Sequence, residues 1–191
     1  MQKGILYPIF EKSWIRPNTC NVWFYSDPHF SDPEMAQKRK DYITDEEQVR
    51  RINSKVGRYD TLVILGDVGN TDMVKKLRGY KILIMGNHDK GRTNYEGLFD
   101  EVYDGPLTIS DRIILSHEPI TGLQPYWFNI HGHDHSNWFT GSRHLNVCAE
   151  HIGYIPIALT QIVKDGLLAE TESIHRITID SAIERKAKKG K

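Results

Sequence analysis

Short apolar runs along the chain each end at polar side chains that can bind metal. The run Ile82–Met85 is predicted to be a buried strand, because its four apolar residues do not alternate with polar ones. It stops at Gly86, whose backbone freedom permits a sharp turn, and Asn87, His88 and Asp89 follow. This pattern predicts three polar groups at the carboxyl edge of a sheet, where open α/β folds place their ligands.

Four other runs repeat this arrangement. They are Val22–Tyr25 before Asp27 and His29, Leu62–Leu65 before Asp67, Ile113–Leu115 before His117, and Phe128–Ile130 before His131, His133 and His135. One such run is common among buried strands. Five such runs, each followed at its carboxyl end by polar residues, predict strands that place Asp, His and Asn side chains at a shared site.

Helical patterns separate some of these runs. Thr44 and Glu47 have the spacing of a capping box, and apolar residues then recur every three or four positions, which predicts a helix over Asp45–Val56. A shorter helix is predicted over Asp72–Arg78, ended by Gly79. Strand, helix and strand in succession indicate β-α-β crossings and a parallel sheet.

The rest of the chain is predicted to be mainly β. Strands are expected at Ile5–Tyr7, Trp14–Ile15, Val102–Tyr103, Leu107–Ile109, Arg112–Leu115 and His144–Val147. Ile155–Val163 and Leu167–Thr171 would form a hairpin around Lys164–Gly166. No repeat or linker is visible, so residues 1–191 are expected to be a single domain. Its motif-bearing part covers 22–135, and a basic, frayed tail covers 180–191.

Composition narrows the functional classes. The 191 residues are 39% hydrophobic and 26% charged, as expected of one folded domain. The 25 basic and 25 acidic residues cancel, which gives no general attraction to nucleic acid or membranes. Cys20 and Cys148 form no C-x-x-C pair, so neither a thiolate zinc site nor a disulfide framework is expected. The sequence shows no leader pattern or membrane span, and we therefore expect a cytoplasmic location.

The residues at the strand ends supply carboxylate, amide and imidazole donors without thiolate, which suits Mn, Fe, Zn or Ni. Asp27 and His29, like His133 and His135, lie two residues apart and can approach one cation from two sides. There are more donors than one tetrahedral ion can use. They suit two ions that share a carboxylate, roughly 3.5–4 Å apart, an arrangement that promotes in-line displacement at phosphorus and lowers the pKa of a bound water toward about 7.

The ordered motifs resemble those of the calcineurin-like metallophosphoesterases. They are Asp27-Pro28-His29, Gly66-Asp67, Gly86-Asn87-His88-Asp89, His117 and Gly132-His133-Asp134-His135. The resemblance implies an α/β fold, a four-layer αββα sandwich with two mixed central β-sheets and a metal site at the carboxyl ends of the strands. It also implies one ion held by Asp27, His29, Asp67 and His135, and a second held by Asp67, Asn87, His117 and His133.

The resemblance further implies a phosphoesterase in which a metal-bridging hydroxide attacks phosphorus in line. Asn87 and His88 would assist catalysis, with His88 facing the substrate, while Asp89 would support their loop. Similarity to small bacterial, archaeal or phage members favours a phosphodiesterase with two divalent ions, Mn before Fe, Zn or Ni. A phosphomonoesterase is the alternative, followed by a non-catalytic metal-binding scaffold.

Substrate contacts are less well defined by the sequence. The expected substrate is a small phosphate ester, with a nucleotide as one candidate. Nucleic acid stays open because of the basic tail, and the oligomeric state is not predicted. The protein phosphatase branch has Asp and then Arg where this chain has Asn70 and Thr71, which argues against that activity. His131, Arg92 and Asn70 are candidate substrate-binding residues, and Asn70 could also hydrogen-bond His88.

Overall fold

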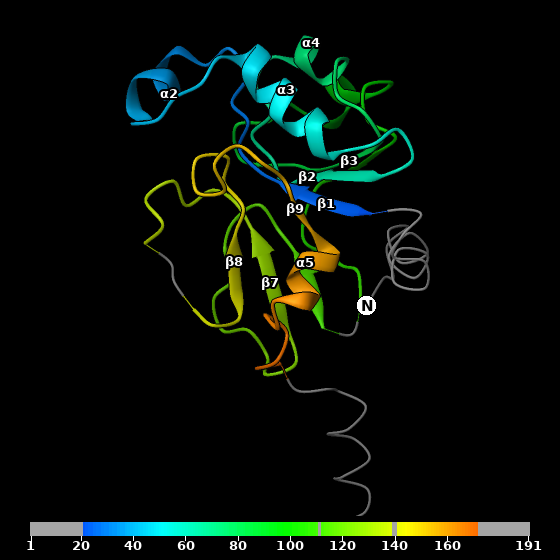
Figure 1. Cartoon of the computed structure of the whole chain (residues 1–191), viewed down its shortest axis with the longest axis vertical. Coiled ribbons are helices and arrows are strands. Elements are labelled where there is room, and N and C mark those ends of the chain that lie inside the picture. The colour runs from blue at the N-terminus through cyan, green and yellow to red at the C-terminus, as the bar shows by residue number, and fades with distance from the viewer. Residues whose placement is uncertain (1–20, 111, 139–140, 172–191) are drawn as a thin grey trace, which may run out of the picture.

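Two β-sheets form the centre of the protein, with helices on the outer side of one of them (Figure 1). The structure is a computed structural model that describes residues 21–110, 112–138 and 141–171. The described elements are β1 (Val22–Tyr25), α2 (Pro33–Lys38), α3 (Asp45–Lys55), β2 (Thr61–Ile64), α4 (Thr71–Val74), β3 (Tyr80–Ile84), the 3₁₀ helix η1 (Arg92–Tyr95), β4 (Glu101–Tyr103), β5 (Leu107–Thr108), β6 (Ile113–Leu115), β7 (Phe128–His131), β8 (His144–Asn146), β9 (Ile157–Ala158) and α5 (Leu159–Lys164).

The first sheet has the strand order β4-β3-β2-β1-β9. Strands β1 to β4 are parallel, and β9 joins the far edge antiparallel to β1. The parallel sheet predicted from the β-α-β pattern is therefore confirmed for β1, β2 and β3. Because these strands share one direction, the loops that follow them leave from the same edge of the sheet.

The second sheet has the order β5-β6-β7-β8, with β6, β7 and β8 parallel and β5 antiparallel. Both sheets are thus mixed, as predicted. A hydrophobic core between them contains Phe24 and Ile84 from the first sheet and Leu115 and Phe128 from the second. This packing brings the loops after β6 and β7 toward the loops after β1, β2 and β3.

Helices α3 and α4 cover the outer face of the first sheet. Ile52 and Val74 are fully buried there, in a second core that includes Leu62 and Leu83. The N-cap of α3 is Thr44, whose hydroxyl accepts a hydrogen bond from the backbone N–H of Glu47 at 3.3 Å. The helix predicted from this capping pattern is confirmed, and it ends at Lys55.

The predicted C-terminal hairpin is wrong. Strand β9 covers only Ile157–Ala158, and the chain then turns into helix α5. Leu159 and Ile162 lie three residues apart on one helical face, and both are buried in the core between the sheets. A short run of apolar residues fits a strand or a helix equally well, and burial of this face favours the helix. Helix α4 is also shorter than predicted, since it ends at Val74.

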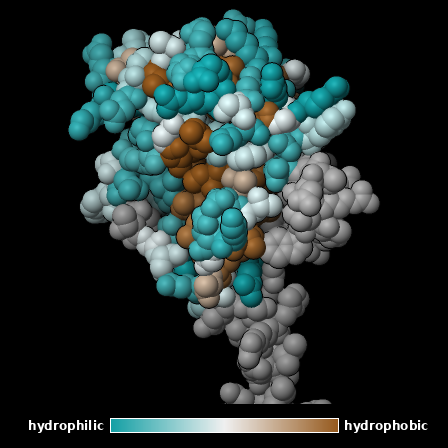
Figure 2. Space-filling view, viewed as in Figure 1, coloured by the Kyte–Doolittle hydropathy of each residue, from teal (hydrophilic) through white to brown (hydrophobic). Residues whose placement is uncertain are grey.

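Other boundaries qualify the predicted architecture. Helix α5 contacts β1 and β9, so a fourth, helical layer on the second sheet stays a prediction. The strands expected at Ile5–Tyr7 and Trp14–Ile15 lie outside the described residues. None of the described helices is long and apolar enough to span a membrane. Polar residues cover much of the face shown in Figure 2, where a band of hydrophobic residues runs from below α3 toward α5.

Candidate metal centre

The loops after five strands bring the predicted ligands together. Asp27 and His29 follow β1, Asp67 follows β2, His117 follows β6, and His133 and His135 follow β7. Their side chains form two groups, Asp27–His29–His135 and Asp67–His117–His133, and in each group one donor atom per residue lies within 4.8 Å of the others. Asn87, which follows β3, contacts the second group. The described chain therefore contains two neighbouring clusters that could each bind a metal ion.

The backbone at this site is strained. Asp27, His29, Asp67 and His133 all have positive φ, at 55°, 45°, 53° and 66°. Side-chain-bearing residues disfavour this region, and such strain concentrates at functional sites. Hydrogen bonds between loops hold the conformation, including the bond from the N–H of Asp27 to the carbonyl of Gly66 at 3.1 Å and from the N–H of His29 to the carbonyl of Asp67 at 3.0 Å.

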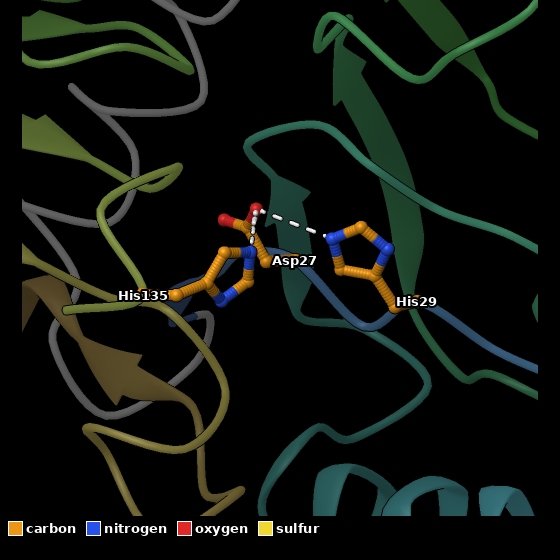
Figure 3. A group of neighbouring side chains, drawn as sticks. All are labelled: Asp27, His29 and His135. Atoms are coloured by element: carbon orange, nitrogen blue, oxygen red, sulfur yellow. Dashed lines mark ion pairs between the residues drawn. The ribbon is translucent and has the colours of Figure 1, made fainter. Parts of the chain in front are cut away.

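The two carboxylate oxygens of Asp27 have different roles, because one accepts hydrogen bonds from the fold and the other faces the histidines. Oδ2 accepts hydrogen bonds from the Ser26 hydroxyl at 2.5 Å, the backbone N–H of His133 at 2.8 Å and the Cys148 thiol at 3.2 Å. Oδ1 faces Nε2 of His135 at 3.4 Å and Nε2 of His29 at 3.7 Å (Figure 3). Burial favours the neutral acid, but contacts with His135 and His29 outweigh it and hold the pKa of Asp27 well below its usual value.

The close approach of Asp27 to the loop after β7 requires glycine at position 132. A Cβ there would lie 1.9 Å from Oγ of Ser26 and 2.2 Å from Oδ2 of Asp27. No side chain fits at such distances, so Gly132 allows the loop that carries His133 and His135 to reach the Asp27 carboxylate.

Each of three histidines uses its Nδ1 to bond the protein and directs its Nε2 toward the site. Nδ1 of His29 donates to the Asp32 carboxylate at 3.1 Å, and Nδ1 of His117 donates to the Leu65 carbonyl at 2.7 Å. Nδ1 of His135 donates to Oε1 of Glu150 at 2.5 Å. Bonding at Nδ1 leaves a lone pair on Nε2 of the neutral ring, which is the usual arrangement of a metal-ligating histidine.

Two imidazole nitrogens and one amide oxygen converge in the second group. Nε2 of His117 lies 2.8 Å from Oδ1 of Asn87 and 3.2 Å from Nδ1 of His133, which is itself 3.0 Å from the same Asn87 oxygen. Lone pairs that face one another repel unless a cation or proton lies among them. In the first group, Nε2 of His29 and Oδ1 of Asp27 are buried without a hydrogen-bond partner. Both clusters therefore fit divalent cations.

Asp67 lies between the two groups. Its Oδ2 is 3.5 Å from Nε2 of His29 and also 3.5 Å from Nε2 of His117. Its Oδ1 accepts a hydrogen bond from the backbone N–H of His88 at 2.9 Å. One oxygen thus faces both clusters, while the other holds the loop that carries Asn87 and His88.

Asp89 supports that loop. Its Oδ2 accepts from the backbone N–H groups of Gly86 at 2.8 Å and Asp67 at 2.9 Å, and its Oδ1 accepts from the N–H of Val68 at 3.0 Å and the Tyr95 hydroxyl at 2.8 Å. All four bonds are with the protein, so the carboxylate of Asp89 joins the loops after β2 and β3.

The remaining candidate residues differ in their positions. His88 is exposed, with its ring centre 5.7 Å from that of His29. Asn70 caps α4 with its side-chain oxygen and donates from its Nδ2 to the Ser31 hydroxyl at 3.1 Å, so both ends of its amide have partners other than His88. His131 is fully buried beside His144, which leaves it no surface for substrate contact. Arg92 is exposed at the start of η1.

Sequence reasoning missed the residues that support the ligands. Asp32 bonds His29 and also caps α2, and its position three residues after His29 is a local signal that could have identified it. Glu150 and Cys148 lie more than ten residues beyond His135, and Arg39 precedes Glu150 by over a hundred. Such distant residues can be placed only by the fold.

Two clefts border the clusters. One has a volume of about 590 Å³ and is lined by His29, His88 and His135 together with α2 and Lys38–Asp41. The other has a volume of about 520 Å³ and lies beside Asn87 and His117, with Asp104 and Glu118 in its wall. Open space therefore borders both clusters.

Two His/Asp clusters after the strands of a two-sheet α/β fold offer donor sets that could hold metal ions for hydrolytic chemistry. Residues 20–170 match the family model described as calcineurin-like phosphoesterase, and the chain belongs to this family. The protein is accordingly a metal-dependent hydrolase of phosphate esters, which confirms the family and enzyme class predicted from the motifs.

A solved structure is also similar. It is the crystal structure of the protein of unknown function AQ665 from Aquifex aeolicus, with 26% sequence identity and a TM-score of 0.64. The alignment covers 76% of this chain and 98% of that one. No curated protein matches the chain.

Proposed function

We propose that this protein is a phosphodiesterase that works with two divalent ions, with Mn²⁺ as the first candidate. The observation that carries the proposal is the position of Asp67 Oδ2, which lies 3.5 Å from a histidine of each cluster. A carboxylate oxygen placed in this way can serve two ions at once.

The residues would divide between the two ions as the family resemblance implies. Asp27, His29, Asp67 and His135 would hold one ion, and Asp67, Asn87, His117 and His133 would hold the other. The donors are oxygen and nitrogen, which suits Mn²⁺, Fe²⁺, Zn²⁺ or Ni²⁺. When bound, the ions would supply an activated water and neutralise charge on the phosphoryl oxygens.

His88 is the residue we assign to the substrate. Its backbone N–H is held by Asp67, and its exposed side chain lines the larger cleft beside His29. From this position the imidazole can donate a hydrogen bond to a phosphoryl oxygen or a proton to the leaving oxygen. Asn87 lies against the ligands His117 and His133, so it would act from the side of the second ion.

The two clefts favour a diester over a monoester. One cleft borders the Asp27 cluster and the other borders the Asn87–His117 side. A phosphodiester carries a substituent on each side of phosphorus, whereas a monoester would fill only one of these spaces. A phosphomonoesterase is the second candidate. A scaffold function, a nucleic acid substrate and a cytoplasmic location stay predictions.

The test compares hydrolysis of bis-para-nitrophenyl phosphate and para-nitrophenyl phosphate by metal-stripped protein resupplied with Mn²⁺. We expect metal-dependent turnover with preference for the diester. His88→Ala should lower kcat by about 10²–10⁴ while retaining the bound metal. The matched control is His151→Gln, since His151 is exposed and lines the same cleft, and Gln can keep the hydrogen bond to the Asp134 carbonyl.

Preference for the monoester would support the second candidate. Full metal binding without turnover of either ester would support the scaffold. Equal loss of activity in the His88 and His151 variants would contradict the role assigned to His88.

A further inference from the structure

A buried ion pair lies behind one of the two clusters. The Arg39 side chain is 2% exposed, and its Nε lies 3.2 Å from Oε2 of Glu150. The other carboxylate oxygen of Glu150 accepts a hydrogen bond from Nδ1 of His135 at 2.5 Å. Nε2 of the same imidazole is 3.4 Å from Oδ1 of Asp27. Arg39, Glu150, His135 and Asp27 thus form a continuous chain of charged and polar groups.

Arg39 also contacts the backbone beside Asp27, which is at the other end of this series of groups. Its Nη2 donates to the carbonyl of Asp27 at 2.6 Å, and its Nη1 lies 3.4 Å from the carbonyl of Pro28. One guanidinium therefore contacts the loop that carries Asp27 and His29 as well as the carboxylate that orients His135. Segments more than a hundred residues apart in the sequence are held together at this point.

Arg39 and Glu150 each have a buried side-chain atom that faces only the opposite charge of the other among the described residues. Arg39 Nε and Glu150 Oε2 are buried, and their ion pair lacks the alignment of a hydrogen bond, so each depends on the charge opposite. Burial raises the pKa of Glu150, but the hydrogen bond with His135 and the charge of Arg39 lower it below its usual value. The geometry shows the same arrangement, because Oε1 of Glu150 faces Nδ1 of His135 at 2.5 Å and Oε2 faces the Arg39 guanidinium at 3.2 Å.

The side chains of the second cluster are oriented by other groups, although the backbone N–H of His133 donates to Asp27 Oδ2 at 2.8 Å. His117 is oriented by the Leu65 carbonyl, and Asp67 is bonded by the His88 backbone. His29, although in the first cluster, is oriented separately by Asp32. A change at Glu150 should consequently reach one ion site through His135 and leave the other unaffected.

We propose that Arg39 and Glu150 are positioning residues for the ion site formed by Asp27, His29 and His135. Glu150 holds the Nδ1–H of His135, so that the Nε2 lone pair faces Asp27 Oδ1. Arg39 fixes the direction of the Glu150 carboxylate and ties it to the Asp27 loop. The inference rests on the proposed two-ion function.

A competing arrangement exists in the same place. His135, Cys148 and Glu150 also offer donor atoms within 4.8 Å of one another, so Glu150 could instead bind an ion directly. Glu150→Gln separates the two roles. The amide oxygen of Gln can still accept from the Nδ1–H of His135, but a neutral amide is a much weaker ligand than a carboxylate.

The experiment measures Mn²⁺ binding to the metal-stripped full chain by isothermal titration calorimetry. Electron paramagnetic resonance of the same samples reports whether two Mn²⁺ ions are magnetically coupled. We expect two ions in the unaltered protein. In Glu150→Ala, one ion should bind 10–100-fold more weakly and the coupled signal should be lost at limiting metal, while the affinity of the other ion is unchanged.

Glu150→Gln should retain most of the affinity, and Arg39→Lys should weaken the same site as Glu150→Ala. Glu34→Gln is the matched control, because Glu34 lines the same cleft and forms an exposed ion pair with Lys38. Circular dichroism of each metal-free variant checks that the chain is folded.

The outcomes separate this inference from the proposed function. Binding of fewer than two ions by the unaltered protein would refute both. Two ions in the unaltered protein and in Glu150→Ala, with equal affinities, would refute the inference alone. Equal weakening of both sites would make the pair a general structural support and overturn the site-selective role. A loss in Glu150→Gln as large as in Glu150→Ala would make Glu150 a ligand and also overturn it.

Discussion

Substitution of Asp89 tests whether its carboxylate holds the loops after β2 and β3 together. The carboxylate accepts four hydrogen bonds of 2.8–3.0 Å, three of them from backbone N–H groups. In Asp89→Asn the least costly orientation keeps the amide oxygen toward Gly86 and Asp67. The Tyr95 hydroxyl can turn to accept from the new NH₂ group, but the N–H of Val68 then faces a donor.

The expected cost follows from this geometry. One backbone N–H loses its acceptor, and two remaining bonds lose a charged partner, where a bond to a charged group is worth about 1.5–3 kcal/mol. We expect the free energy of unfolding to fall by about 2–4 kcal/mol. For a chain of this size the corresponding decrease in Tm is roughly 5–12 °C. Tyr95→Phe removes one bond and should cost about 1 kcal/mol.

Thermal unfolding of metal-free protein, followed by circular dichroism, measures these differences. The double variant should be less destabilised than the sum of the single ones, because the two residues share a hydrogen bond. Asp72→Asn is the control, since Asp72 is exposed and paired only with Lys75, and its Tm should not change measurably. Equal Tm values for Asp89→Asn and the control would refute the assigned role.

Three further outcomes are expected. His117→Ala should reduce bound Mn²⁺ from two ions per chain to one, measured by elemental analysis after dialysis; retention of two would contradict the assignment of His117 as a ligand. Lys40→Glu should raise KM several-fold for a diester with an additional phosphate but not for bis-para-nitrophenyl phosphate, because exposed Lys40 lines the cleft beside His88 and its charge would attract the added phosphate. Equal changes for both substrates would contradict this. In a Cys20→Ser background Cys148 should be inert to Ellman's reagent until the protein is unfolded in urea, because the thiol is fully buried and burial raises its pKa; rapid reaction of the native protein would contradict it.

The sequence predicted the candidate ligand positions that the fold brings together, because their signal is local. An apolar run such as Leu62–Leu65 predicts a buried strand, and an Asp or His just after it must lie at the strand's carboxyl end. Once several strands are parallel, these ends meet, so seven predicted residues come together although the sequence contains no information about distances. The helix α3 was predictable for the same reason, since its cap and apolar face lie within a few residues.

Features that depend on distant contacts could not be predicted in this way. The segment after β9 forms a helix because Leu159 and Ile162 fill the core between the sheets, a space created by residues far away in the sequence. Glu150 orients His135 only because β8 and the loop after it lie beside the loop after β7. For His131 a local signal was present but pointed to a different role. Its place within a histidine-rich motif suggested substrate contact, but it is the last residue of β7 and is buried.

In the proposed two-ion site, Asp27 and Asp67 each have a structural role and a ligand role on one carboxylate. Asp27 Oδ2 and Asp67 Oδ1 accept backbone N–H groups from other loops, while Asp27 Oδ1 and Asp67 Oδ2 face the histidines. Replacement of either aspartate would therefore remove a ligand and also a link between strained loops. The side chain of His133 lies within hydrogen-bond distance of Asn87 and His117, while its backbone N–H maintains the link to Asp27. Loss of metal in a His133 variant would thus report on coordination, whereas the same loss in an Asp27 variant would equally reflect the collapse of the loops that hold the site.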